Sequence, residues 1–125
     1  MIRLSEMYLI AAEAALPTDA LKASNYLNEI RKRSPGLALS TSSTVTLDMI
    51  LNEKSKELFA EGQRYWDMIR LNKTIQFNDN FITPTVIITS RPTSIDRTYY
   101  KAILPIPKSE LDANPAIASQ QNPQY

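Results

Sequence analysis

The sequence predicts a mostly α-helical protein built from a helix hairpin, further helices and a C-terminal strap. Apolar residues recur at steps of three and four over residues 3–33 and 46–72, which is the period of an amphipathic helix. The period is lost over residues 73–125, where Asn, Thr and Pro are frequent. A length of 125 residues fits one domain, so we expect a single domain over residues 1–125.

The first two expected helices form a hairpin. One covers residues 3–16 and ends at Pro17, because proline lacks the N–H that a helix needs. Thr18 or Asp19 can cap the next, which covers residues 19–33. So short a connection predicts antiparallel packing. The expected packing faces consist of Leu4, Met7, Tyr8, Ala11, Ala12 and Ala15 in the first helix and of Ala20, Ala23, Leu27 and Ile30 in the second.

A third helical stretch is expected after a Ser/Thr-rich loop at residues 37–46. It begins near Thr46 and runs toward Leu71. Gly62 lies inside it, and glycine in a helix costs about 1 kcal/mol relative to alanine. We therefore expect a break or bend at Gly62. The expected apolar face contains Leu47, Ile50, Leu51, Leu58, Phe59, Tyr65, Trp66 and Ile69.

The rest of the chain predicts a long irregular loop and a strap over residues 73–125. A β-branched run at residues 85–89 allows at most a short extended piece. The segment AILPIP, residues 102–107, predicts a non-helical strap, because a residue before proline is pushed toward extended geometry. Ser109 is expected to cap one helical turn, which Asn114 and the following proline close.

Composition excludes several classes of function. The net charge of +1 argues against a nucleic-acid binder, which usually carries a strong basic excess. The sequence has no His and no Cys, so the commonest zinc ligands and the Ser-His and Cys-His nucleophile pairs are excluded. Carboxylate catalysis and metals bound by oxygen remain open.

Three glutamates, Glu53, Glu57 and Glu61, recur every four residues and would share one face of a continuous helix. Such a stripe could hold a hard cation or supply an acid/base pair. It is also typical of a solvated face, or of acids that pair with neighbouring cations such as Lys54 and Lys56. We favour this second interpretation and expect no metal and no cofactor.

Four charged residues around the only tryptophan alternate in sign at steps of three, so adjacent pairs can touch on a helix. The favoured interpretation is structural, with arginine forks that could also reach backbone carbonyls. The alternative hypothesis is that Tyr65 and Trp66 stack on a sugar ring, although a tryptophan in a periodic helix is more often core. The four charged residues are Glu61, Arg64, Asp67 and Arg70.

Residues 50–70, ILNEKSKELFAEGQRYWDMIR, resemble the signature of the SusD/RagB family. That signature typically reads Glu-Arg-x-x-Glu-Leu-x-x-Glu-Gly-x-Arg-x-x-Asp-x-x-Arg. Lys54 stands where the family usually has Arg, which loses bidentate bonding. The matching positions are Glu53, Glu57, Leu58, Glu61, Gly62, Arg64, Asp67 and Arg70.

Three flanking segments also resemble this family. They are RLSEMYLIAAEA at residues 3–14, YLNEIRKRS at residues 26–34 and the C-terminal strap at residues 103–125. The family usually closes on Gln-Asn-Pro-Gly-Tyr, whereas Gln124 stands here in place of the glycine. The four motifs occur in order between residue 3 and residue 125, so the resemblance extends over nearly all of the chain.

The resemblance implies a tetratricopeptide-like helical fold and a protein that is not an enzyme. Family members are surface-exposed lipoproteins of Bacteroidetes-type outer membranes. They bind glycans or other nutrients and pass them to a SusC-type TonB-dependent transporter. Whole members are several times longer, so we expect this chain to be the C-terminal, mainly scaffold portion, without the signal and the lipidated Cys. The resemblance implies that the matched motif has a structural role. No residue of this chain can be matched to a ligand-binding residue of the family.

Two alternatives stay open from the sequence. A helix-repeat module could bind protein partners on its concave face. A carboxylate-dependent glycoside hydrolase could use two acids of the signature, but a single helix stripe supplies no cleft. Truncated helices would also leave apolar surface exposed, which predicts self-association. The acids available to a hydrolase are Glu53, Glu57, Glu61 and Asp67.

Overall fold

The computed structural model describes residues 3–77 and 92–124 and divides the chain into two compact units, Met1–Arg64 and Tyr65–Tyr125. The β-branched run at residues 85–89 lies outside the described residues. The expectation of a single domain over residues 1–125 stays a prediction.

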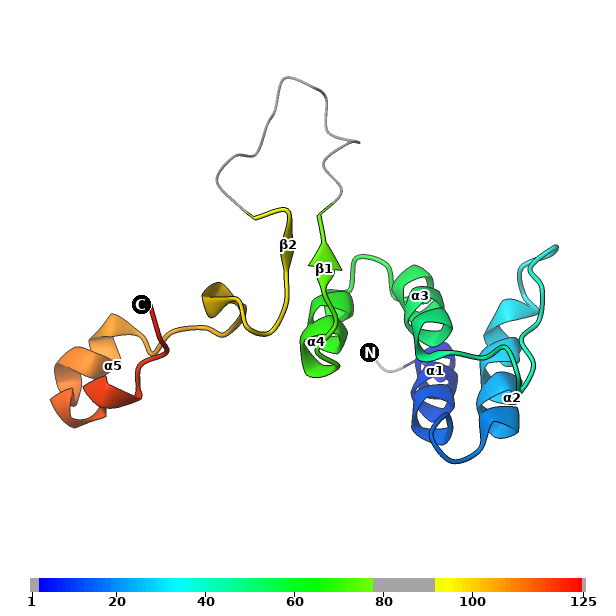
Figure 1. The fold of residues 1–125 in the computed structure, drawn as a ribbon, viewed down its shortest axis with the longest axis horizontal. Helices are drawn as coiled ribbons and strands as arrows, with labels where there is room; N and C mark the ends of the chain where they lie inside the picture. The colour runs from blue at the N-terminus through cyan, green and yellow to red at the C-terminus, as the bar shows by residue number, and fades with distance from the viewer. Residues whose placement is uncertain (1–2, 78–91, 125) are drawn as a thin grey trace, which may run out of the picture. The chain divides into compact units, whose positions relative to one another are not determined.

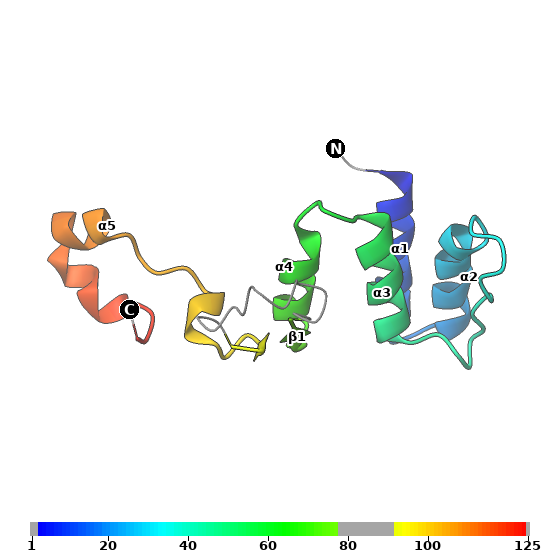
Figure 2. The same ribbon diagram turned by 90° about the horizontal axis from the view of Figure 1, so that it is seen from above.

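The first unit is a helix hairpin with a third helix packed on it. Helices α1 (Leu4–Ala15) and α2 (Ala20–Arg31) pack together, and α3 (Leu47–Glu57) packs mainly against α1. Figures 1 and 2 show the three helices side by side. The mostly helical fold and the hairpin predicted from the sequence are thus confirmed. The core consists of Leu9, Ala12, Ala23, Leu27, Ile30, Val45 and Ile50.

Side-chain caps fix where α2 and α3 begin. The carboxylate of Asp19 accepts a hydrogen bond from the backbone N–H of Lys22 at 2.9 Å. The hydroxyl of Thr46 accepts one from the N–H of Met49 at 3.2 Å. Each cap satisfies an N–H that has no partner within its helix. Both helices therefore begin at their predicted positions.

The predicted packing face of α1 is partly wrong. Leu9, which the prediction omitted, is fully buried, whereas Leu4 is 73% exposed and Met7 is 49% exposed. Apolar side chains occur on more than one side of α1, so its period alone does not identify the buried side. In the structure α2 and α3 cover the side that carries Leu9 and Ala12.

The helical stretch after residue 46 breaks as expected at Gly62. Helix α3 ends at Glu57, and α4 (Gln63–Arg70) begins directly after Gly62. Gly62 has φ +76° and Ala60 has φ +63°, which is the left-handed region. A Cβ at Gly62 would meet nothing within 4 Å, so glycine serves the backbone conformation there and not a close approach.

Two aromatic residues near this break are exposed, contrary to the predicted apolar face. Phe59 is 82% exposed and Trp66 is 65% exposed. Helix α3 ends at Glu57 and α4 begins at Gln63, so residues before and after the break do not share the stripe of one continuous helix. Leu58 is buried as predicted.

The second unit contains most of α4, a two-stranded ladder and a helical C-terminal region. Strand β1 (Ile75–Gln76) pairs antiparallel with β2 (Ser94–Ile95), with Ile75 opposite Ile95. A 3-10 helix (Tyr100–Ala102), helix α5 (Lys108–Ala113) and a second 3-10 helix (Pro115–Gln120) follow. None of the helices in the described ranges is long and apolar enough to cross a lipid bilayer.

Side chains near the C-terminus hold the strap in place. The Oε1 atom of Gln121 accepts a hydrogen bond from the N–H of Ile106 at 2.9 Å, and its Nε2 donates to the carbonyl of Ile106 at 3.0 Å. The amide of Asn122 donates to the carbonyl of Leu104 at 2.6 Å. Among the described residues no strand pairs with the extended strap, and these amides satisfy some of its backbone groups.

The predicted cap of the short helix after the strap is wrong. Helix α5 begins at Lys108, and the residue at its N-cap is Pro107, which makes no side-chain cap. Ser109 lies inside the helix. The φ of −56° at Pro107 already suits a helix entry, so the first turn forms two residues earlier than expected. Asn114 ends α5 as predicted.

Exchanging the residue types in the break should shift stability in opposite directions. Gly62→Ala places a Cβ in the left-handed region and should lower the free energy of unfolding by about 1 kcal/mol. Ala60→Gly removes such a Cβ and should raise it by about 0.5 kcal/mol. Urea unfolding followed by circular dichroism measures both. Shifts of the same sign would refute this explanation of the break.

Gln121→Glu should destabilise the C-terminal region. The carboxylate keeps an acceptor for the N–H of Ile106 but loses the donor to its carbonyl, which costs about 1 kcal/mol. Hydrogen exchange at the amide of Ile106 and thermal unfolding report the change. Gln120→Glu is the matched control, because it adds the same charge at the neighbouring exposed position. Equal effects of the two variants would show that the clamp contributes nothing.

Candidate functional site

The first acid of the signature forms a buried ion pair. Glu53 Oε2 lies 3.1 Å from Arg31 Nη1, and both residues are buried. The Nε and Nη2 atoms of Arg31 donate to the carbonyl of Ala38 at 3.0 and 2.6 Å. Arg31 therefore joins the end of α2 to α3 and to the loop between them.

The same loop is also tied to α2 by an amide. The Oδ1 atom of Asn28 accepts hydrogen bonds from the N–H and hydroxyl of Ser40, at 2.8 and 2.9 Å. Its Nδ2 donates to the carbonyl of Ser40 at 2.8 Å. The Ser/Thr-rich loop is thus held at a defined point on the helix.

The other two glutamates of the stripe contact different arginines. Glu57 Oε2 lies 2.5 Å from Arg33 Nη2, and Glu61 pairs with Arg3. The three acids therefore pair with three different arginines, and Glu53 also lies 3.8 Å from Lys56 Nζ, one of the neighbouring cations expected from the sequence. Within residues 3–77 and 92–124 no group of three acidic side chains is placed to hold a metal ion.

A further contact joins the beginning of α1 to the beginning of α4. Gln63 Nε2 donates to Glu6 Oε1 at 3.0 Å. Arg3 and Glu6 belong to the N-terminal flanking motif, and Glu61 and Gln63 lie in the signature. Two motifs far apart in the sequence thus contact each other inside the first unit.

The predicted ladder of alternating charges forms only in part. Arg64 Nη1 donates to the carbonyl of Leu51 at 2.9 Å, and Glu61 pairs elsewhere, so the expected Glu61–Arg64 pair is wrong. The reason is the break at Gly62, which leaves Glu61 outside α4. Asp67 and Arg70 do pair, at 2.9 Å.

The two aromatic ligand candidates from the sequence have different surroundings. The hydroxyl of Tyr65 donates to the carbonyl of Ala102 at 2.7 Å, so it anchors the 3-10 helix Tyr100–Ala102. Its ring meets that of Trp66 edge-on, with centroids 5.2 Å apart. Trp66 is mostly exposed. Binding of a sugar by either residue stays a prediction.

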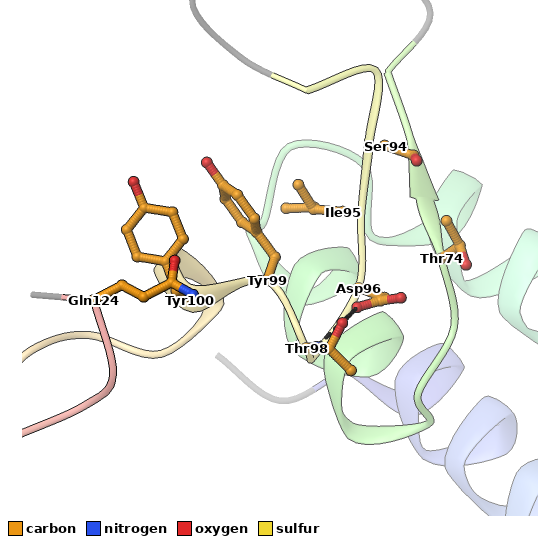
Figure 3. Close-up of a pocket in the computed structure, with 8 residues that line it drawn as sticks. All are labelled: Thr74, Ser94, Ile95, Asp96, Thr98, Tyr99, Tyr100 and Gln124. Atoms are coloured by element: carbon orange, nitrogen blue, oxygen red, sulfur yellow. Dashed lines mark hydrogen bonds between the residues drawn. The ribbon is translucent and has the colours of Figure 1, made fainter.

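An open hollow of about 510 Å³ lies in the second unit, beside the two-stranded ladder. Figure 3 shows the tyrosine rings of Tyr99 and Tyr100 extending to the same side of the chain, with their hydroxyl groups outermost. A smaller hollow of about 230 Å³ shares these tyrosines and is also lined by Arg97. The larger hollow is lined by Thr74, Ser94, Ile95, Asp96, Thr98, Tyr99, Tyr100 and Gln124.

Asp96 supplies the ionised group of the larger hollow. Its Oδ1 accepts hydrogen bonds from the hydroxyl of Thr98 at 2.5 Å and from the N–H of Thr98 at 2.8 Å. These bonds favour the charged form and lower the pKa of the Asp96 carboxyl below its ordinary value. Asp96 is therefore a carboxylate at neutral pH and remains one into more acidic solution.

The tyrosines form a short aromatic wall. The rings of Tyr99 and Tyr100 meet with centroids 5.1 Å apart and planes at 62°. Lys101 Nζ lies 5.3 Å from the centroid of Tyr100, which occupies one face of that ring. Gln124 also lines the hollow. Its φ is +71°, and it stands where the C-terminal motif of the family usually has glycine.

Reasoning from the sequence missed this hollow. Its lining residues come from three separate stretches, near Thr74, at residues 94–100 and at Gln124, so no local pattern joins them. Two local signals were present. Asp96 and Thr98 have the spacing of an Asx turn, and two adjacent tyrosines follow them.

Comparisons with known proteins agree with these motifs. A model described as the SusD family matches residues 1–125. A SusD superfamily protein from Bacteroides vulgatus is 40% identical with a TM-score of 0.84, over 99% of this chain and 27% of that one. A second B. vulgatus protein, provisionally described as a sugar-binding protein, is 45% identical with a TM-score of 0.80, over 99% of this chain and 28% of that one.

A curated relative is similar over a shorter stretch. SusD-like protein P38 of Formosa agariphila is 34% identical over 91 residues, which are 61% of this chain and 17% of that protein. This chain thus spans less than a third of the length of each of these relatives. The match over all 125 residues confirms the resemblance seen in the motifs: the chain belongs to the SusD family.

Proposed function

We propose that this chain is the mainly scaffold portion of a non-enzymatic, glycan-binding component of an outer-membrane uptake system. Membership of the SusD family supports this role. So does the similarity to the B. vulgatus protein that is provisionally described as sugar-binding. The proposed ligand is an oligosaccharide or another nutrient, and no cofactor is needed.

The observation that carries the scaffold role is the use made of the signature's charged groups. Each of its four acids pairs with an arginine, and Arg64 donates to a backbone carbonyl. Groups engaged in this way hold segments of the protein together and are poorly placed to bind ligand. They also lack the pair of carboxyls facing across a cleft that glycoside hydrolysis uses, which argues against the hydrolase alternative.

Membership of the family also suggests a partner protein and a cellular location, and both are part of this proposal. The partner is a SusC-type TonB-dependent transporter, and the protein acts at the cell surface on the outer membrane. No nucleic acid is proposed as a partner, because the net charge is only +1.

Exposed apolar residues on α1 favour a second role in protein interaction or self-association. Leu4, Met7 and Ile10 are all more than two-fifths exposed. An open hollow of about 490 Å³ lies between α1 and α2, lined on one side by Ala11 and Ala14 and on the other by Tyr26. Apolar surface of this kind often marks an interface. Light scattering over a range of protein concentrations tests it, and a species that stays monomeric at high concentration would contradict it.

Arg64→Ala should lower stability without selectively weakening ligand binding. It removes a hydrogen bond from a charged donor, which is worth about 1–2 kcal/mol, or roughly 3–8 °C in Tm for a chain of this size. Arg64→Lys keeps a cation and one donor, so it should lose less. Thermal unfolding gives the stability, and calorimetric titration with neutral hexasaccharides gives the affinity. Unchanged stability together with lost sugar binding would defeat the scaffold role.

A further inference from the structure

We infer that the hollow bounded by Asp96, Tyr99, Tyr100 and Gln124 is a subsite for an uncharged sugar residue of an oligosaccharide. This inference rests on the proposed glycan-binding function and adds to it the surface and the class of sugar. The volume of about 510 Å³ lies within the range of about 300–1,000 Å³ that is usual for small-molecule sites.

The aromatic wall suits the apolar face of a sugar ring. Aromatic planes attract the C–H groups of such a face. Lys101 lies over one face of Tyr100, so the ring of Tyr99 is the better platform for stacking. Tyr99, like Thr98, Tyr100 and Gln124, lines both the larger and the smaller hollow, so the two hollows adjoin at these residues.

The wall is held in a fixed position. The hydroxyl of Tyr65 is bonded to the carbonyl of Ala102, at the end of the 3-10 helix that begins with Tyr100. The backbone N–H of Tyr99 donates to the carbonyl of Asp96 at 3.1 Å. Preorganised groups of this kind lose little conformational entropy when a ligand binds.

Polar groups around the wall match the hydroxyl groups of a sugar. Asp96 uses Oδ1 for Thr98, and the Oδ2 atom of the same carboxylate is the acceptor through which a ligand hydroxyl could bind. Charge-assisted bonds to a carboxylate are stronger than neutral ones. Ser94 and Thr74 add hydroxyls to the lining, and Gln124 adds an amide.

The backbone of Gln124 supports a role beyond packing. A residue other than glycine at φ +71° is strained, and such strain is concentrated at functional sites. Glycine, the usual residue of the family at this position, would relieve the strain. It would also remove the amide that lines both hollows.

The charge of the residues that line the larger hollow favours an uncharged sugar residue over an acidic one. Among the described residues that line the larger hollow, Asp96 is the ionised one and there is no cation. A carboxylate repels uronate or sulfate groups, so an uncharged residue is favoured there. Arg97 lines only the smaller hollow.

Calorimetric titration of the whole chain tests the inference, with maltohexaose, xylohexaose and mannohexaose as neutral probes and hexagalacturonate as the acidic one. The wild type should bind at least one neutral probe more tightly than the acidic one. Tyr99→Ala should weaken that binding about tenfold, and Tyr99→Phe should preserve it. Asp96→Asn, which keeps an acceptor for Thr98, should weaken it several-fold. Phe59→Ala removes an exposed aromatic ring outside the hollow and should change nothing.

The outcomes separate this inference from the function on which it rests. Wild-type protein that binds none of the four probes would overturn the subsite and leave the scaffold role standing, because that role also admits other nutrients. Neutral binding that survives both Tyr99→Ala and Asp96→Asn would overturn the subsite alone, as would a loss seen only with Trp66→Ala. Tighter binding of hexagalacturonate would overturn the uncharged class. Circular dichroism shows whether each variant is folded. If Tyr99→Ala is unfolded, titration of the conservative variant Asp96→Asn decides whether the hollow binds the sugar.

Discussion

The buried ion pair between Arg31 and Glu53 is the interaction on which the first unit depends. Hydrophobic packing brings α1, α2 and α3 together, but apolar contacts are not directional and do not fix where α2 ends against α3. The pair does, because Arg31 also holds the carbonyl of Ala38. A buried charge without a partner is costly, so sequences that keep one member must keep the other. This explains why the signature begins with a glutamate.

In the second unit, side-chain amide and hydroxyl groups tie the irregular segments together. Gln121 and Asn122 bond to the backbone of the strap, and Tyr65 bonds to the 3-10 helix at Ala102. These contacts connect segments with little regular structure. Their result is a wall of tyrosines in a defined position, beside the carboxylate of Asp96. The C-terminal motif of the family is thereby explained as a clamp on the strap.

The sequence predicted those features that depend on local patterns. The cap at Asp19, the beginning of a helix near Thr46 and the break at Gly62 follow from the chemistry of single residues. The packed face of α2 was predicted correctly, because most of its apolar residues occupy one side and Leu21 is the exposed exception. The face of α1 was not, since Leu4 and Met7 on its other side are equally apolar. Where a helix carries apolar residues on two sides, its packing against other helices determines which side is buried.

Features that depend on the path of a loop were beyond prediction. The contact between Arg31 and Ala38 requires the loop after α2 to fold back, and no pattern in that loop indicates this. The hollow beside the ladder is similar, since it joins Thr74, Asp96 and Gln124 from distant positions. The family resemblance did not indicate the hollow either. Gln124, one of the residues that line it, differs from the glycine that is usual in the family.

A double-mutant cycle on the Arg31–Glu53 pair tests the central claim most directly. Arg31→Met and Glu53→Gln should each lower the free energy of unfolding by about 3 kcal/mol, because each removes the buried partner of a buried charge. Arg31→Met leaves Glu53 with the longer contact to the exposed Lys56, at 3.8 Å, and Glu53→Gln leaves Arg31 with its bonds to the neutral carbonyl of Ala38. The double variant should lose at least about 1 kcal/mol less than the sum of the two. The exposed pair of Lys108 and Asp112, 3.0 Å apart, is the control and should couple by less than about 0.5 kcal/mol. Additive losses at Arg31 and Glu53 would contradict the claim that the signature locks the helices together through this pair.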